Sequence, residues 1–150
     1  MKIVRACAEH ADTLTEIAIA AKSHWGYPDS WMRRWRKALT VTPQYVIVRP
    51  TYVAVFESKV VGFCALQIEG TDALLDHLWV LPSFMGRGVG RALFEHAETI
   101  ARASGAVRLR MVGDPHAESF YSRMGAVVYG RESADMDGQK RLLPLLEKAL

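Results

Sequence analysis

Hydrophobic and polar positions follow two different periods along the chain, and these separate helical from extended segments. Apolar residues recur every three or four positions in residues 9–23 and 88–103, which is typical of amphipathic helices. The same spacing predicts a helix that is capped by Asp29 or Ser30 and ends at Leu39. Alternating or short continuous apolar stretches predict strands. The predicted strands cover residues 1–6, 52–56, 60–68, 73–81, 107–112, 126–131 and 140–146.

A fourth, shorter helix is predicted over residues 115–124. Asp114 can cap it, Pro115 fits its first turn, and Gly125 ends it. The resulting element order is β-α-α-β-β-β-α-β-α-β-β. We therefore expect a single α/β domain over residues 1–150, with a mixed central β-sheet flanked by helices.

Composition and charge agree with a soluble globular domain. The chain has 150 residues, of which 50% are hydrophobic, and a net charge of +3. This charge is too mild to indicate nucleic-acid binding, and no apolar run approaches the roughly 20 residues of a membrane span. Cys64 falls in a predicted strand and Cys7 directly follows one, without metal-ligand spacing, which favours buried free thiols in a reducing compartment. No signal-peptide pattern opens the sequence, so we expect a cytoplasmic protein. Since the cysteines lack metal-ligand spacing, we also expect no bound metal.

Residues 78–94 carry the clearest functional signal. A predicted strand runs into Pro82, three glycines follow at positions 86, 88 and 90, and a helix begins at once. The first N–H groups of a helix have no partner within it, and the helix dipole adds partial positive charge there. Because glycines let a ligand approach the backbone closely, this segment predicts a phosphate cradle. The alternative is a glycine-rich turn without a ligand.

Two common phosphate-binding motifs do not fit this segment. The P-loop requires Lys followed by Ser or Thr after its last glycine, whereas Arg91 and Ala92 follow Gly90 here. The dinucleotide fingerprint requires glycines at relative positions 1, 3 and 6, but the sixth position from Gly86 is Arg91.

The six residues from Met85 to Gly90 resemble the pyrophosphate loop of GNAT-type N-acetyltransferases, which reads Gln/Arg-x-x-Gly-x-Gly/Ala. Met85 replaces the usual Gln or Arg. Residues 114–126 resemble a later segment of the same family, Asn-x-x-Ala-x-x-Phe-Tyr-x-x-x-Gly-Phe. The matching residues are Ala117, Phe120, Tyr121 and Gly125, while Asp114 replaces Asn and Ala126 replaces the last Phe.

The resemblance implies a GNAT acyl-CoA N-acyltransferase fold with acetyl-CoA as co-substrate. In that fold two neighbouring parallel strands splay apart, here 73–81 and 107–112, and the pantetheine arm enters the gap. Unpaired strand groups near Leu78 and Val80 would hydrogen-bond to this arm. The pyrophosphate would lie on the loop from Gly86 to Arg91. The expected cofactor-binding residues are Leu78, Val80, Met85, Gly86, Arg87, Gly88, Val89, Gly90, Arg91, Asp114 and Tyr121.

Acetyl transfer to an amine requires a base and a proton donor. The resemblance places Tyr121 near the thioester sulfur, where a protonated phenol can donate to the leaving thiolate. The alternative is a core tyrosine. The base is less determined: Asp76 could accept a proton or bind the amine, and His77 titrates nearest neutrality. Strand alternation predicts that these two point to opposite faces, with Leu74, Asp76, Leu78 and Val80 on one face.

The region between the first two helices is expected to help build the acceptor site. Trp25 and Tyr27 could form an aromatic wall for an amine through cation–π attraction. Trp31 and Trp35 belong to the same aromatic cluster, but for these two residues packing between the helices is at least as good an explanation as a role in the acceptor site. The basic residues Arg33, Arg34, Arg36 and Lys37 are interpreted as the solvated face of a helix.

The favoured function is therefore an N-acetyltransferase that moves an acetyl group directly to a primary amine in a ternary complex. Its partner would be a small-molecule or peptide amine, with no nucleic acid or membrane, and a homodimer is compatible with the sequence. A non-catalytic acyl-CoA-binding module is the main alternative, because it would also bind CoA but would not release thiol. A nucleic-acid-binding domain is a third, and it would show steeply salt-dependent binding.

Overall fold

A single seven-stranded sheet forms the centre of the computed structural model, which describes all 150 residues. The strands lie in the order β1-β2-β3-β4-β5-β7-β6, and every neighbouring pair is antiparallel except β4 and β5. This confirms the predicted mixed sheet. The strands are β1 Lys2–Arg5, β2 Thr51–Phe56, β3 Lys59–Glu69, β4 Asp72–Val80, β5 Arg108–Val112, β6 Val127–Met136 and β7 Gln139–Ala149.

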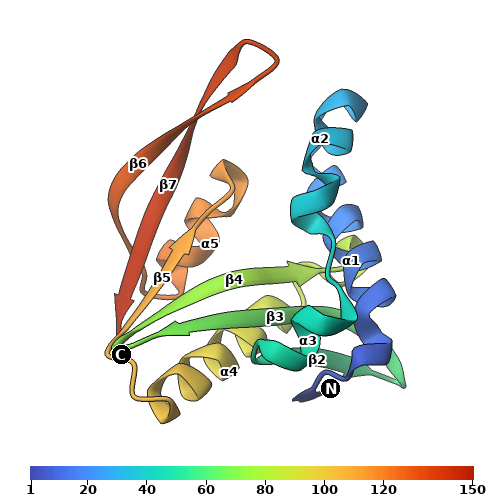
Figure 1. Ribbon diagram of the computed structural model, residues 1–150, viewed down its shortest axis with the longest axis vertical. Helices are drawn as coiled ribbons and strands as arrows, with labels where there is room; N and C mark the ends of the chain where they lie inside the picture. The colour runs from blue at the N-terminus through green and yellow to red at the C-terminus, as the bar shows by residue number, and fades with distance from the viewer.

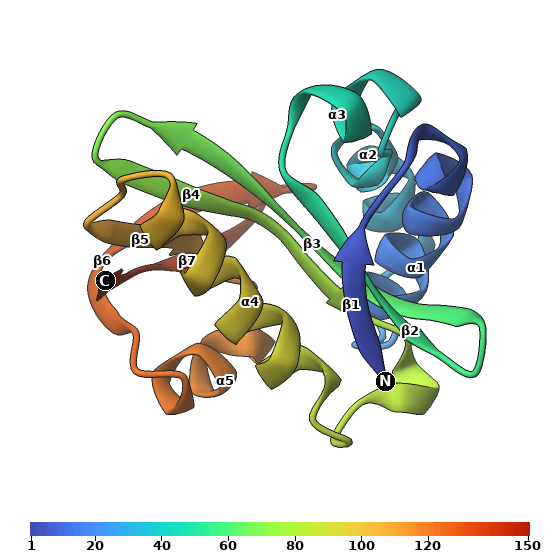
Figure 2. The same ribbon diagram turned by 90° about the horizontal axis from the view of Figure 1, so that it is seen from below.

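Helices cover both faces of this sheet. In Figures 1 and 2, α1, α2 and α3 lie together on one side of β2–β4, and α4 crosses the other side. The helix α5 lies beside α4, below β5 and the β6–β7 hairpin. The helices are α1 Ala11–Ser23, α2 Asp29–Leu39, α3 Pro43–Val48, α4 Val89–Ala103 and α5 Glu118–Arg123, with short 3-10 turns at Ala8–His10, Pro82–Phe84 and Pro115–Ala117.

Each face of the sheet has its own hydrophobic core. On the α4 side, Leu93 and Phe94 pack against strand residues such as Cys64 and Leu66, all fully buried. On the α1 side, Leu14 and other apolar residues of α1 pack against strand residues of β2 and β3. The sheet therefore separates the hydrophobic core under α4 from the one under α1.

The parallel strands β4 and β5 pair over only three residues each. Asp72–Leu74 faces Arg108–Arg110, and beyond this point the strands diverge. Figure 1 shows β4 and β5 close together near the C-terminus and spreading apart toward their far ends. The divergence leaves one edge of β4, from Leu75 to Val80, without a strand partner. The predicted splay of these two strands is therefore present.

Some local features differ from the sequence-based expectation. The helix α3 was not predicted, although Thr42 caps it and Pro43 occupies its first turn. The β6–β7 hairpin is longer than predicted and turns at Asp137 and Gly138. Cys64 is a buried free thiol as expected, but Cys7 lies after β1 and is exposed.

A β-bulge in β4 changes which residues share a face. His77 faces Ala65, but the next partner pair is Leu75 and Leu66, so Asp76 is an extra residue without a partner on β3. Such an insertion reverses the alternation of side chains beyond it.

The bulge overturns the predicted arrangement of β4. Leu78 and Val80 pack in the core under α4. Asp76 instead lies with His77 against α3, and both contact Tyr45. The prediction that Asp76 and His77 point to opposite faces, and that Leu74, Asp76, Leu78 and Val80 share one face, is therefore wrong.

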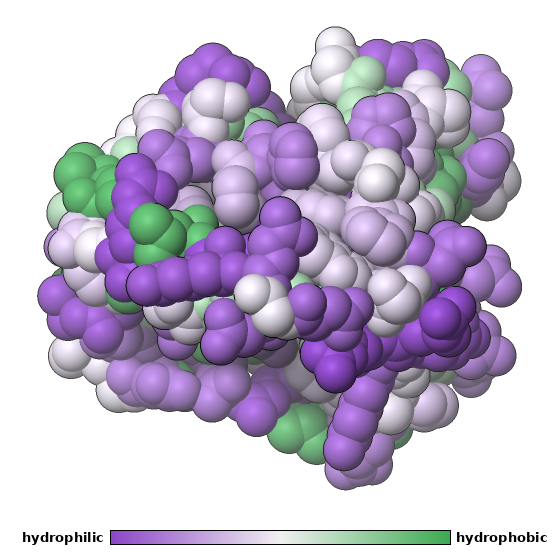
Figure 3. Space-filling view, turned by 90° about the horizontal axis from the view of Figure 1, so that it is seen from above, coloured by the Kyte–Doolittle hydropathy of each residue, from purple (hydrophilic) through white to green (hydrophobic).

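The end of the molecule that carries α2 and the tip of the β6–β7 hairpin is mainly hydrophilic, with scattered hydrophobic patches (Figure 3). None of the helices combines the length and apolarity that crossing a bilayer requires.

Candidate active site

The loop between β4 and α4 forms a row of free backbone donors. The N–H groups of residues 86–91 donate no hydrogen bond to the rest of the chain, and the first bond of α4 runs from Ala92 to the carbonyl of Gly88. Gly88 caps the helix in the left-handed region, at φ +85°. Six consecutive donors at the start of a 15-residue helix make a site for an anionic group.

The three glycines of this loop have different roles. A Cβ at Gly86 or Gly88 would meet no atom within 4 Å, so both face open space, and both have positive φ. A Cβ at Gly90 would lie 3.1 Å from Cε1 of Phe120. Gly90 therefore lets α4 approach α5, while Gly86 and Gly88 keep the cradle open and supply its turn.

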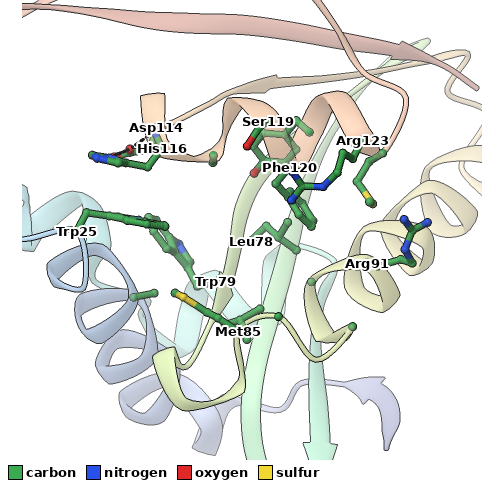
Figure 4. A pocket seen from close by; sticks show the side chains of 18 residues that line it. Trp25, Leu78, Trp79, Met85, Arg91, Asp114, His116, Ser119, Phe120 and Arg123 are labelled. Carbon is green, nitrogen blue, oxygen red and sulfur yellow. Dashed lines mark hydrogen bonds and ion pairs between the residues drawn. The ribbon is translucent and has the colours of Figure 1, made fainter.

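A cavity of about 520 Å³ begins at this loop and follows the edge of β4 toward α1. Figure 4 shows Arg91 and Arg123 at the α4 end and Trp25 and His116 at the other. Among the predicted cofactor residues, Arg87 and Val89 do not line it: the Arg87 guanidinium lies over Phe84, and Val89 is buried in the core. The predicted residues that do line it are Leu78, Val80, Met85, Gly86, Gly88, Gly90, Arg91, Asp114, Tyr121 and Trp25.

Tyr121 lies on α5 at the wall of this cavity. Its side chain packs against Phe94 and Phe120, and only 8% of the residue is exposed. Its hydroxyl makes no hydrogen bond within the protein. Burial, followed by the charge of Asp114, raises the pKa of Tyr121, so the phenol remains protonated at neutral pH. The structure thus holds a protonated donor that faces the cavity without a partner.

A second cavity, of about 370 Å³, lies on the α1–α3 side and contains the two candidate bases. Tyr45 donates a hydrogen bond to Oδ2 of Asp76, and its ring meets that of His77 edge-on at 5.6 Å. Trp79 lines both cavities, so the two cavities are adjacent at that residue. Asp76 is therefore held close to the edge of β4 that the first cavity follows.

His77 is less suited than Asp76 to accept a proton. The indole N–H of Trp79 donates to Nδ1 of His77 at 2.9 Å, so the acceptor nitrogen of the neutral ring is already occupied. Burial lowers the pKa of His77, against the opposing charge of Asp76, which favours that neutral form.

Asp114 joins segments that are distant in the sequence. Its carboxylate accepts a hydrogen bond from Lys22 Nζ at 2.6 Å, from the Tyr27 hydroxyl at 2.8 Å and from the backbone N–H of His116 at 2.9 Å. The guanidinium of Arg141 lies 3.8 Å away. Burial raises the pKa of Asp114, but the hydrogen bond and charge of Lys22 outweigh it and hold that pKa at about 2.

Trp25 and Tyr27 thus have different positions. Trp25 stacks on His116, with ring centroids 4.7 Å apart and planes 5° apart, and lines the first cavity. Tyr27 lines neither cavity, and its hydroxyl also accepts a hydrogen bond from Arg141 at 2.8 Å. Tyr27 therefore contacts His116, on which Trp25 stacks, without lining the cavity itself.

Sequence reasoning missed several residues that the fold brings to these cavities. Tyr45 lies on the unpredicted α3, and the Thr42-Pro43 pair was the signal that could have located this helix. Lys22 and Arg141 reach Asp114 from α1 and β7, more than ninety positions and about thirty positions away, so only the three-dimensional fold joins them. No group of three or more His, Cys, Asp or Glu side chains is arranged to hold a metal ion.

Comparison with known proteins places this architecture among acetyltransferases. The model of the acetyltransferase (GNAT) domain family matches residues 48–125. A peptidyl-lysine N-acetyltransferase, YjaB of Salmonella typhimurium, is 37% identical over 87 residues, which are 57% of this chain and 56% of that protein. The match thus spans little more than half the length of this curated relative.

Solved structures share the whole fold. A GCN5-related N-acetyltransferase from Rhodopseudomonas palustris has a TM-score of 0.82 and 24% identity, with 99% of this chain and 95% of that chain covered. PaiA N-acetyltransferase from Thermoplasma acidophilum, solved in complex with coenzyme A, has a TM-score of 0.78 and 22% identity, with 99% and 98% covered.

Proposed function

Because the chain belongs to the GNAT acetyltransferase family, we propose that it transfers an acetyl group from acetyl-CoA to a primary amine, directly within a ternary complex. The observation that carries this proposal is the row of free N–H groups at residues 86–91, which opens onto the unpaired edge of β4. A phosphate cradle beside an unpaired strand edge matches the two parts of a CoA thioester, an anionic pyrophosphate and an amide-bearing arm.

The residues around the first cavity fit this co-substrate. The N–H groups from Gly86 to Arg91 would hold the pyrophosphate, with open space beside Gly86 and Gly88 for its oxygens. Backbone groups of β4 near Leu78 and Val80 would bind the pantetheine amides. Acetyl-CoA would supply an activated acetyl thioester, and Trp79, which lines both cavities, marks where that thioester and the amine would come together.

The second cavity supplies the amine side of the reaction. A C–N bond forms as the C–S bond breaks, so an ammonium acceptor must lose two protons, one to the sulfur and one to solvent. Asp76 is placed to bind the ammonium or to pass its proton outward. Its Oδ2 is held by Tyr45, and Oδ1 makes no hydrogen bond within the protein.

Tyr121 is placed to serve the leaving group. Its protonated hydroxyl lacks a protein partner and lines the cavity that the thioester arm would occupy. A phenol that donates a hydrogen bond or proton to the departing sulfur lowers the barrier to C–S cleavage.

One experiment separates this enzyme from a module that only binds acyl-CoA. Affinity for CoA would be measured by calorimetry, and free thiol would be followed after acetyl-CoA is mixed with a panel of amines. We expect CoA binding together with thiol release that depends on the amine. Binding without such release would support the module, and failure to bind CoA would contradict both.

A further inference from the structure

The second cavity has opposite charges on its walls. Asp76 lies at the β4 side, and the ammonium of Lys22 lies at the α1 side. Aromatic rings of Trp35, Tyr45 and Trp79 form much of the remaining wall. A ligand that fits this cavity is therefore offered both a carboxylate and a cation.

The positive wall carries an excess of charge. Lys22 Nζ lies 4.2 Å from the ring centroid of Trp35, and only one of its three N–H groups has a partner, at Asp114. Arg141 approaches the same carboxylate at 3.8 Å, and its guanidinium lies 5.1 Å from the Trp35 ring centroid. Two cations, Lys22 and Arg141, thus share the carboxylate of Asp114, so the formal charges of these three side chains sum to +1.

On the negative wall, the carboxylate of Asp76 can accept a further hydrogen bond. Asp76 accepts one hydrogen bond, from Tyr45, and about a third of its side chain is exposed, at 35%. His77 Nε2 lies 4.0 Å from Asp76, beyond hydrogen-bond distance. An ammonium group can therefore reach this carboxylate without displacing a protein partner.

We propose that the acetyl acceptor is a free amino acid or a close analogue, with its amine at Asp76 and its carboxylate at Lys22. This assignment rests on the proposed acetyltransferase function and narrows its acceptor. The cavity, at about 370 Å³, is near the small end of ligand sites, which suits a single small molecule. A polycationic amine would bring a second positive charge close to Lys22, and a lysine side chain within a peptide would bring no carboxylate to it.

The test compares acceptors that differ only in the carboxylate. Thiol release from acetyl-CoA would be measured with the standard L-amino acids other than cysteine, which carries a thiol itself, with the matching L-amino acid amides, and with a lysine peptide blocked at both ends. We expect kcat/KM for the best amino acid to exceed that for its amide at least tenfold. The amine of an amino acid amide is less basic, so a larger fraction of it is neutral and able to attack at neutral pH, and a preference for the acid would run against this advantage.

A pair of variants then tests whether Lys22 causes the preference for the amino acid over its amide. Lys22→Gln should reduce the ratio of acid to amide to within about threefold, because the acid loses its partner and the amide does not. Lys37→Gln removes one positive charge from an exposed position of α2 that makes no ion pair, and it should keep the wild-type ratio. Quenching of tryptophan fluorescence by acceptor in the presence of CoA gives the same comparison without turnover.

The outcomes separate the acceptor from the activity. Equal rates for acids and amides, or a blocked lysine peptide that exceeds every amino acid, would overturn the amino-acid assignment and leave acetyl transfer intact. No release with any amine would overturn both. If Lys22→Gln does not fold, the wild-type comparison of acid with amide still decides the matter.

Discussion

At the scale of single residues, the buried phenol of Tyr121 is able to donate a proton or a hydrogen bond. Because burial raises the pKa of this phenol, it stays protonated across the range of an enzyme assay. Tyr121→Phe should keep the fold and CoA affinity, since the hydroxyl has no protein partner to lose, and should lower turnover about 10²-fold. Tyr129→Phe, at an exposed position of β6, is the matched control and should keep full turnover. Wild-type turnover in Tyr121→Phe would leave this residue as packing alone.

Asp76 provides a second prediction at this scale. Asp76→Asn nearly preserves shape but removes the charge, so it should lower kcat/KM for amine acetylation at least tenfold while calorimetry shows unchanged CoA affinity. Asp135→Asn removes an exposed carboxylate on β6 that makes no ion pair, and it should leave both quantities unchanged. An effect below about threefold for Asp76→Asn would indicate that water, or the acceptor itself, disposes of the proton.

The position of Asp76 could be predicted from sequence only in part. Its type and strand were evident, but its direction depends on a bulge that is visible only when β3 and β4 are paired. Strict alternation placed Asp76 and His77 on opposite faces, whereas one inserted residue brings both against Tyr45. Likewise, the occupied Nδ1 of His77 follows from the indole of Trp79, two positions along the strand. These are tertiary facts that neighbouring residues in the sequence do not specify.

At the scale of elements, the strand–loop–helix unit from β4 to α4 was predictable because its signals are local. Glycine spacing and helix periodicity lie within seventeen residues, and the structure differs by a single residue at the start of α4. The helix α3 was missed because six residues are too few for periodicity to be read. The lengths of β6 and β7 were underestimated because each strand is stabilised by its partner rather than by its own pattern.

The glycines of the loop allow a test of the cradle with a built-in control. Gly88→Trp places a bulky side chain in the open space beside the free N–H groups and should abolish CoA binding in calorimetry. Gly70→Trp introduces the same residue at another open position with positive φ, +61°, in the turn between β3 and β4. Both carry backbone strain of about 1–2 kcal/mol, but only Gly88→Trp should affect CoA. Unchanged CoA affinity in folded Gly88→Trp would rule out the cradle.

At the scale of the whole molecule, the charge network around Asp114 fastens the α1 side to the far half of the sheet. Lys22 belongs to α1, Tyr27 to the α1–α2 connection and Arg141 to β7, and all three meet one carboxylate. A second contact lies at the tip of the β6–β7 hairpin, where the carboxylate of Asp137 is 3.3 Å from the guanidinium of Arg34 on α2. The α1–α2 side and the far half of the sheet are thus joined at two places, at Asp114 and at Asp137.

This network should make stability depend on acid pH. The folded pKa of Asp114 is about 2, below the roughly 3.9 of an unfolded chain, so its stabilisation is complete above about pH 4 and is lost as the pH falls toward 2. A shift of this size corresponds to about 2–3 kcal/mol. The net contribution of the pair is smaller, because burial lowers the pKa of Lys22 despite its partner.

Asp114→Asn tests this expectation and also restores the residue that the resembling family segment carries. The substitution removes the charge that balances Lys22 and Arg141, so the free energy of unfolding should fall by about 1–3 kcal/mol at pH 6 and its decline between pH 4 and 2 should become shallower. Urea unfolding at pH 6, 4 and 3 would measure both effects. Asp137→Asn removes an exposed carboxylate with a cationic partner, and it should change stability by less than about 1 kcal/mol. Parallel pH profiles for wild type and Asp114→Asn would show that Asp114 does not fasten the two halves through its charge.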